Sequence, residues 1–75
     1  MPVKQSVKQG SSEPLSEREL EVLRLLRTEL TGPEIARELT VSLHTVRTHT
    51  SNIYSKLGVD KRQAAVRRAE DLGLL

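Results

Sequence analysis

Apolar residues recur at the three- and four-residue spacing of amphipathic helices in four stretches of this chain. The first stretch begins at Ser16, which can accept a hydrogen bond from the backbone N–H of Glu19 while the Glu19 carboxylate accepts one from the Ser16 N–H, forming a capping box. This helix should run to about Arg27 or Thr28. Its expected core positions are Leu20, Leu23 and Leu26, with help from Val22 and Leu30.

A second helix is predicted over about residues 32–39 by the same kind of signal. Thr31 and Glu34 have the spacing of another capping box, and Pro33 falls in the first turn, where its missing N–H costs little. The residues expected to face inward are Ile35, Ala36 and Leu39.

The third helix, over about residues 43–56, follows after only three residues. Ser42 can cap it, and Gly58 is placed to take the left-handed conformation that ends a helix. Two helices joined by so short a connection form a helix-turn-helix. The inward positions of the third helix are Val46, His49 or Thr50, Ile53 and Leu57.

A fourth helix should begin after Asp60 or Lys61, with Gly73 ending it. The fold expected is therefore all-α, a four-helix bundle containing a helix-turn-helix and formed by residues 15–75. Residues 1–14 are polar and without a period, so we expect a flexible arm or linker there. The fourth helix should place Val66, Ala69 and Leu72 inward, and Leu74 and Leu75 should fold back on the core.

The composition agrees with a small helical domain. Among the 75 residues, Tyr54 is the one aromatic residue and there is no cysteine, so aliphatic side chains must build the core. Disulfides and cysteine-ligated metal sites are excluded. No apolar run approaches the length of a membrane span or a signal peptide, so we expect no membrane association and a cytoplasmic location.

Charge distinguishes the third helix from the others. Residues 1–38 hold six basic and seven acidic side chains, whereas residues 39–75 hold six basic and three acidic ones, and no acid occurs between Glu38 and Asp60. One face of the third helix carries short or basic hydrogen-bonding side chains, and a helix of this kind fits the major groove of DNA. We interpret it as a DNA recognition helix with four base-reading candidates: His44, Arg47, Thr48 and Ser51.

Other classes of function fit the sequence less well. Thr45, Ser51 and Ser55 have no histidine and carboxylate placed to activate them, so we do not expect an enzyme. His44 and His49 are turned about 140° apart on a helix, which argues against a metal pair, and no cofactor is expected. Two alternatives stay open: a helical module that binds another protein, and a nucleic-acid binder that does not read bases.

Several motifs together resemble the LuxR-type family of DNA-binding domains. They are residues 15–23 (LSERELEVL), 34–36 (EIA), 41–42 (VS), 45–46 (TV), His49, 56–59 (KLGV) and 65–66 (AV). The resemblance covers about residues 15–75. It implies the effector domain of a bacterial transcription regulator, with the third helix in the major groove of an inverted-repeat operator.

The resemblance also implies roles for individual residues. It supports the four base readers, adds phosphate contacts from Thr31, Thr45 and Lys56, and places a dimer contact on the fourth helix at Ala64, Ala65 and Arg68. The partners it implies are double-stranded DNA and a second copy of the chain on that DNA. Apart from the resemblance, RNA polymerase is a further candidate partner.

Three positions depart from the family pattern. Glu29 stands where the glycine that ends the first helix is usual, so that turn should be looser or built differently. Pro33 replaces a polar residue that often reaches a phosphate. Lys61 replaces the usual cap of the fourth helix, a role that Asp60 could take over.

Overall fold

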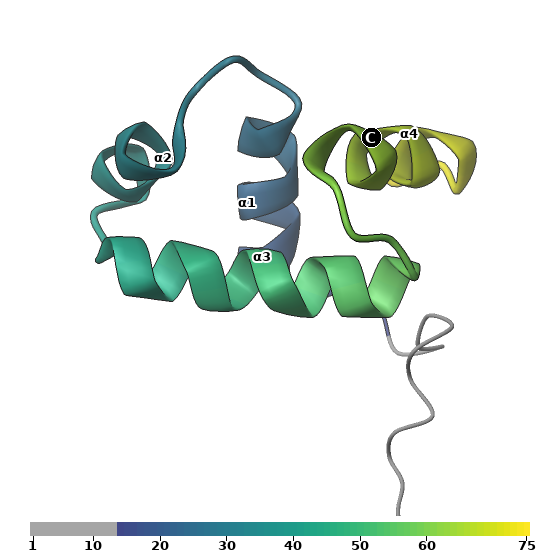
Figure 1. Ribbon diagram of the computed structural model, residues 1–75, viewed down its shortest axis with the longest axis horizontal. Coiled ribbons are helices and arrows are strands. Elements are labelled where there is room, and N and C mark those ends of the chain that lie inside the picture. Colours follow the sequence, from purple (N-terminus) through teal and green to yellow (C-terminus); the bar gives the residue numbers. More distant parts are fainter. Residues whose placement is uncertain (1–13) are drawn as a thin grey trace, which may run out of the picture.

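The computed structural model describes residues 14–75, which form four α-helices (Figure 1). The all-α bundle and its helix-turn-helix are therefore confirmed. The arm predicted at residues 1–14 lies, except for Pro14, outside the described residues. The helices are α1 (Glu17–Leu26), α2 (Gly32–Leu39), α3 (Leu43–Leu57) and α4 (Arg62–Asp71).

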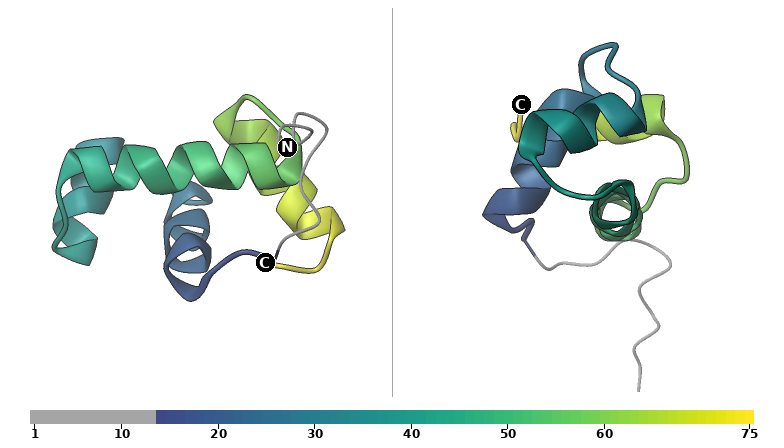
Figure 2. Two further views of the ribbon diagram at one scale, coloured as in Figure 1. Left: turned by 90° about the horizontal axis from the view of Figure 1, so that it is seen from below. Right: turned by 90° about the vertical axis from the view of Figure 1, so that its left-hand side faces the viewer.

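The longest helix, α3, is the one on which the others pack. It contacts each of the other three helices, and α1 also contacts α4. Figure 1 shows α3 along one edge, with α2 above its N-terminal half and α4 above its C-terminal end. The right-hand view of Figure 2 looks along α3 and shows the other helices gathered on one side of it. Among residues 14–75, no helix covers the opposite side of α3.

The predicted helix starts are present. At α1, the Glu19 N–H donates to Ser16 Oγ at 3.1 Å and the Ser16 N–H donates to Glu19 Oε1 at 2.9 Å. At α2, Thr31 and Glu34 exchange the same two bonds at 3.3 and 2.8 Å. Ser42 caps α3, and Gly58 ends it with a φ of 72°, in the left-handed region.

The core is aliphatic, as the composition requires. Its buried members are Val22, Leu23, Leu26, Ile35, Ala36, Val46, Ile53, Leu57, Ala65 and Ala69. Val22 is fully buried, whereas Leu20 only packs against the core from its edge.

The inward position predicted for Leu72 is wrong, because this side chain is 53% exposed. α4 ends one residue earlier, and in Figure 1 its last turn extends past the end of α3. The chain then turns at Gly73 (φ 76°), with the Leu74 N–H donating to the Ala69 carbonyl at 2.8 Å. Leu75 packs against the core instead, whereas Leu74 stays 37% exposed.

The turn after α1 is built differently from a glycine cap. The Thr28 hydroxyl donates to the Leu25 carbonyl and accepts from the Leu30 N–H. The Arg62 guanidinium, from α4, donates to the carbonyls of Leu26 (2.9 Å), Thr28 (2.7 Å) and Leu25 (3.3 Å). Leu25 also accepts from the Thr28 N–H, but the Leu26 and Thr28 carbonyls have no other donor among residues 14–75, so a distant arginine completes the cap that the sequence lacks locally.

Two further helix ends are capped in unusual ways. Lys61, not Asp60, is the N-cap residue of α4, and the cap has no side-chain hydrogen bond, so the expected Asp60 cap is wrong. Thr40, which ends α2, has a φ of 58° and is the one non-glycine residue with positive φ among residues 14–75. A β-branched residue rarely adopts this conformation, which the tight connection between α2 and α3 imposes.

Candidate nucleic-acid interface

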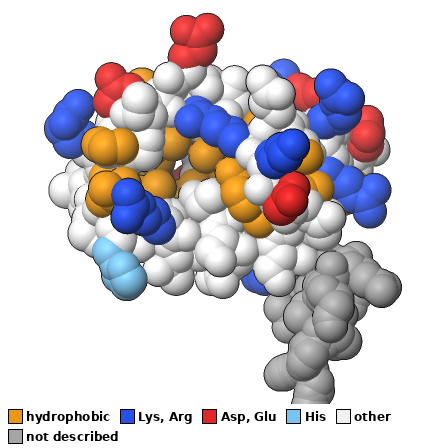
Figure 3. Space-filling view, viewed as in Figure 1, with side chains coloured by type: hydrophobic (Ala, Val, Ile, Leu, Met, Phe, Trp, Pro, Cys, Tyr) orange, Lys and Arg blue, Asp and Glu red, His pale blue; other side chains and the backbone are white. Residues whose placement is uncertain are grey.

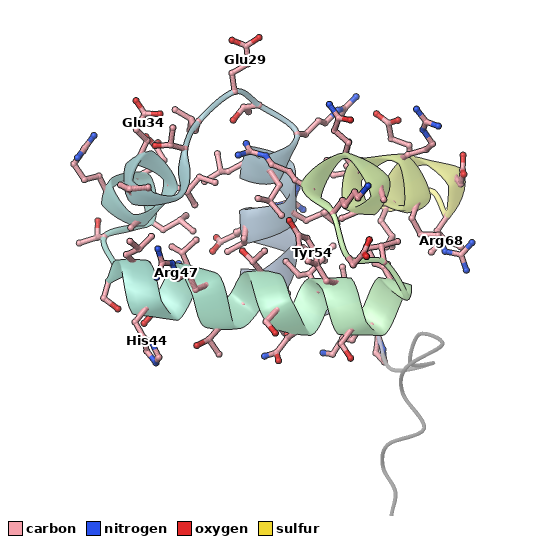
Figure 4. The ribbon with its side chains drawn as sticks, in the orientation of Figure 1. Glu29, Glu34, His44, Arg47, Tyr54 and Arg68 are labelled. Atoms are coloured by element: carbon pink, nitrogen blue, oxygen red, sulfur yellow. The ribbon has the colours of Figure 1, made fainter. Side chains whose placement is uncertain are left out.

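The outer surface of α3 carries the four predicted base readers. Their spacing along the helix places them on one side, and all four are exposed: His44, Arg47, Thr48 and Ser51. Figure 4 shows His44 pointing away from the body of the domain, with Arg47 on the same half of α3 but nearer to α2. Val46, Ile53 and Leu57 are buried on the opposite side. The helix thus presents a polar ridge on an apolar base.

The electrostatic character of this ridge is positive. α3 contains no acidic residue, and the Arg47 guanidinium takes part in none of the ion pairs of residues 14–75. Figure 3 shows blue and pale-blue side chains over the N-terminal half of α3, with no red ones beside them. Nothing in the described part of the chain competes with an anion for Arg47.

The N-termini of α2 and α3 differ as anion sites. At α3, Ser42 Oγ accepts from the Thr45 N–H and donates to Thr45 Oγ1, each at 3.0 Å, and the first turn holds no acid. At α2, the Glu34 carboxylate already occupies the helix end. Hydrogen bonds from the backbone and the hydroxyl of Thr31 hold the pKa of Glu34 below its usual value. The N-terminus of α3 is therefore the more favourable place for a phosphate.

Lys56 forms an ion pair within the domain. Its Nζ lies 2.8 Å from Glu19 Oε1, where the two side chains are 19% and 6% exposed, and also donates to the Pro14 carbonyl at 3.3 Å. Burial raises the pKa of the Glu19 carboxyl, but the bonds from Lys56 and Ser16 outweigh it and the pKa lies below its usual value. One Lys56 N–H remains for a phosphate, so that role stays a prediction.

Sequence reasoning missed this ion pair and the role of Arg62. Glu19 was expected only to cap α1, yet it lies four residues before Leu23 and seven before Leu26, on the buried side of the helix. That spacing is a signal that a buried carboxylate needs a partner. No comparable signal pointed from Arg62 to the end of α1.

On α4, the three residues expected at a dimer contact differ in exposure. Arg68 is exposed, and Figure 4 shows it projecting from the side of the domain away from α2. Ala64 is half-buried. Ala65 is fully buried in the core, so it has no surface to offer a partner.

The described residues hold no sign of a metal centre. His44 is exposed and His49 is half-buried on the packing side of α3. Within residues 14–75, no group of three histidine or acidic side chains lies close enough together to hold a metal ion. None of the four helices is both long and apolar enough to cross a membrane.

Comparison with known proteins agrees with this geometry. Residues 13–69 match the family model GerE, described as bacterial regulatory proteins of the LuxR family. The chain belongs to the LuxR family. It is a helix-turn-helix DNA-binding domain of bacterial transcription regulation, a class of protein that has no enzymatic activity.

The structure is also similar to a solved one, the crystal structure of the response regulator ChrA of a heme-sensing two-component system. The two share 44% sequence identity and superpose with a TM-score of 0.81. The match covers 84% of this chain but 31% of the ChrA chain. The chain therefore spans about a third of the length of that protein.

Proposed function

We propose that the domain reads a specific DNA sequence by placing α3 in the major groove. The observation that carries this proposal is the exposed, acid-free ridge of His44, Arg47, Thr48 and Ser51. Arginine can donate two parallel hydrogen bonds to guanine, and the hydroxyls can bond several base edges. Arg47 is the principal reader because its guanidinium has no competing carboxylate within residues 14–75.

Phosphate contacts then fix the position of α3 in the groove. Thr45 is the best-placed candidate, since the N-terminus of α3 offers backbone N–H groups and no acid. Thr31 is less favourable, because the Glu34 carboxylate lies at the same helix end. Lys56 would share its charge between Glu19 and the DNA.

Two copies are proposed to pair on an inverted repeat through α4, with Ala64 and Arg68 at the contact. In solution the small exposed surface of Ala64 and the like charges of two Arg68 side chains disfavour a dimer. DNA overcomes this because it holds both copies at a fixed spacing.

RNA polymerase is a further proposed partner. By analogy with the response regulator ChrA, the domain would be the DNA-binding part of a longer response regulator. The proposed location is the cytoplasm, because a bacterial regulator must reach the chromosome.

The test is a selection of binding sites from random DNA duplexes, repeated at two salt concentrations. Enrichment of an inverted repeat, with half-sites roughly one helical turn apart, supports a dimeric base reader and gives its operator. Binding without enrichment, with an affinity that falls steeply with salt, would indicate a backbone binder. No binding at low salt would favour the protein-interaction alternative.

A further inference from the structure

A groove of about 700 Å³ lies between the N-terminal end of α2, the side of α3 and the start of α4. Figure 3 shows this hollow near the middle of the face in view, with orange side chains in it and blue ones at its rim. The buried residues Leu26, Ile35 and Val46 form its floor and expose at most 6% of their surface, so the half-buried Leu43, Tyr54 and Val59 supply most of its apolar surface. Its size is within the range of small-molecule sites.

The polar rim of the groove is positive. Arg47 and Arg62 both line it, against one carboxylate, that of Asp60. The Arg62 guanidinium uses Nε and Nη2 for the carbonyls at the end of α1, and Nη1 makes no hydrogen bond within residues 14–75. Arg47 is unpaired in the same part of the chain. Donors for a negative group thus lie beside an apolar surface.

Tyr54 and Ser51 add neutral hydrogen bonding to this rim. Burial raises the pKa of the Tyr54 phenol above its usual value, an effect that Arg62 only partly opposes. The phenol therefore stays protonated at neutral pH and can donate.

We propose that this groove binds a small organic anion, a molecule with an apolar body of one or two rings and one carboxylate or sulfonate. The rings would cover the half-buried Leu43 and Tyr54, and the anion would pair with Arg47. Charge complementarity favours this occupant over a neutral one. It also disfavours a cation, which the two guanidiniums would repel more strongly than the single carboxylate would attract it.

Occupancy has a consequence that rests on the proposed function. Arg47 and Ser51 belong to both the groove and the base-reading ridge. A molecule paired with Arg47 would therefore withdraw the principal base reader. The groove would act as an inhibitory site for DNA binding.

The binding test uses 8-anilinonaphthalene-1-sulfonate as the anion and N-phenyl-1-naphthylamine, which lacks the sulfonate, as its neutral counterpart. The expected result is saturable binding of one sulfonate, with the ¹⁵N–¹H shift changes concentrated at residues around the groove. Arg47→Gln should weaken sulfonate binding about three- to fivefold, as expected for a solvent-accessible ion pair, and should leave the neutral compound unaffected. Arg68→Gln is the matched control, since Arg68 is exposed but does not line the groove.

Equal affinity of wild type and Arg47→Gln, an equal loss in both variants, or shift changes centred away from the groove would each overturn the proposal. A second titration measures operator binding with and without the sulfonate. DNA binding without the compound tests the proposed function by itself. If that binding is present but the sulfonate does not weaken it, inhibition is refuted, whatever the first titration shows.

Discussion

The ion pair between Glu19 and Lys56 gives a quantitative prediction for stability. Glu19→Gln keeps a side-chain oxygen that can accept the bond from the Ser16 N–H, so the capping box survives and only the charge is lost. Lys56 would then face a neutral amide with its side chain 19% exposed. Breaking a fully buried pair costs about 3–5 kcal/mol, and exposed pairs contribute about 0.2–1 kcal/mol. Since Lys56 keeps some access to water, we expect a loss of about 1–2 kcal/mol at pH 7.

The matched control is Glu21→Gln, which removes another acid of α1. Glu21 pairs with Arg18 at 3.1 Å, but these side chains are 49% and 45% exposed, so the expected loss is about 0.5 kcal/mol or less. The assay is urea unfolding followed by far-UV circular dichroism, which gives the free energy of unfolding of both variants and the wild type.

The pH dependence provides a second check. The pKa of Glu19 is lower in the folded protein than its ordinary value of 4.5, so its stabilising contribution is present above that value. The contribution is lost as the pH falls through the folded-state pKa. The difference between wild type and Glu19→Gln should therefore shrink from pH 7 to pH 3. A loss no greater than that of Glu21→Gln, or a difference that persists undiminished at pH 3, would refute the reasoning.

Four further predictions follow from the site and the fold. Arg47→Ala should weaken operator binding by about 1–3 kcal/mol and relax base choice at one position, and equal losses on operator and scrambled DNA would contradict base reading. Lys56→Ala should lower the slope of log K against log salt by about one unit, measured by DNA titration, and an unchanged slope would remove Lys56 from the phosphate contacts. Arg62→Ala should lower the free energy of unfolding by about 1–3 kcal/mol, because the carbonyls of Leu26 and Thr28 lose their donor. A loss below about 0.5 kcal/mol in urea unfolding would show that water replaces the guanidinium. Thr40→Gly should raise the melting temperature, because the left-handed backbone conformation costs threonine about 1 kcal/mol and glycine adopts it freely. A lower melting temperature would mean that the Thr40 side chain stabilises the turn.

The parts of the fold that could be predicted depend on short-range interactions. Each capping box needs only residues three apart, so Ser16 with Glu19 and Thr31 with Glu34 were visible in the sequence. The same holds for Gly58 and for the apolar positions of α3. The base-reading ridge could be predicted because the periodicity of a helix decides which of its residues share a side.

The rest depends on residues far apart in the chain. Lys56 reaches Glu19 across 37 positions, and Arg62 reaches the end of α1 from a similar distance. Which charges meet is set by how the helices cross, which no local pattern encodes. Leu72 shows a related limit. Helical periodicity predicts toward which side of α4 its side chain points, but not where along α4 the core ends.

The packing of all three other helices on α3 has a thermodynamic consequence for recognition. A helix of fifteen residues is only marginally stable alone in water, so the reading ridge exists as a rigid surface only when the whole bundle is folded. The conformational entropy of ordering the α3 backbone is then lost during folding, not during association. DNA meets a preorganised α3, and only exposed side chains such as Arg47 must still be immobilised.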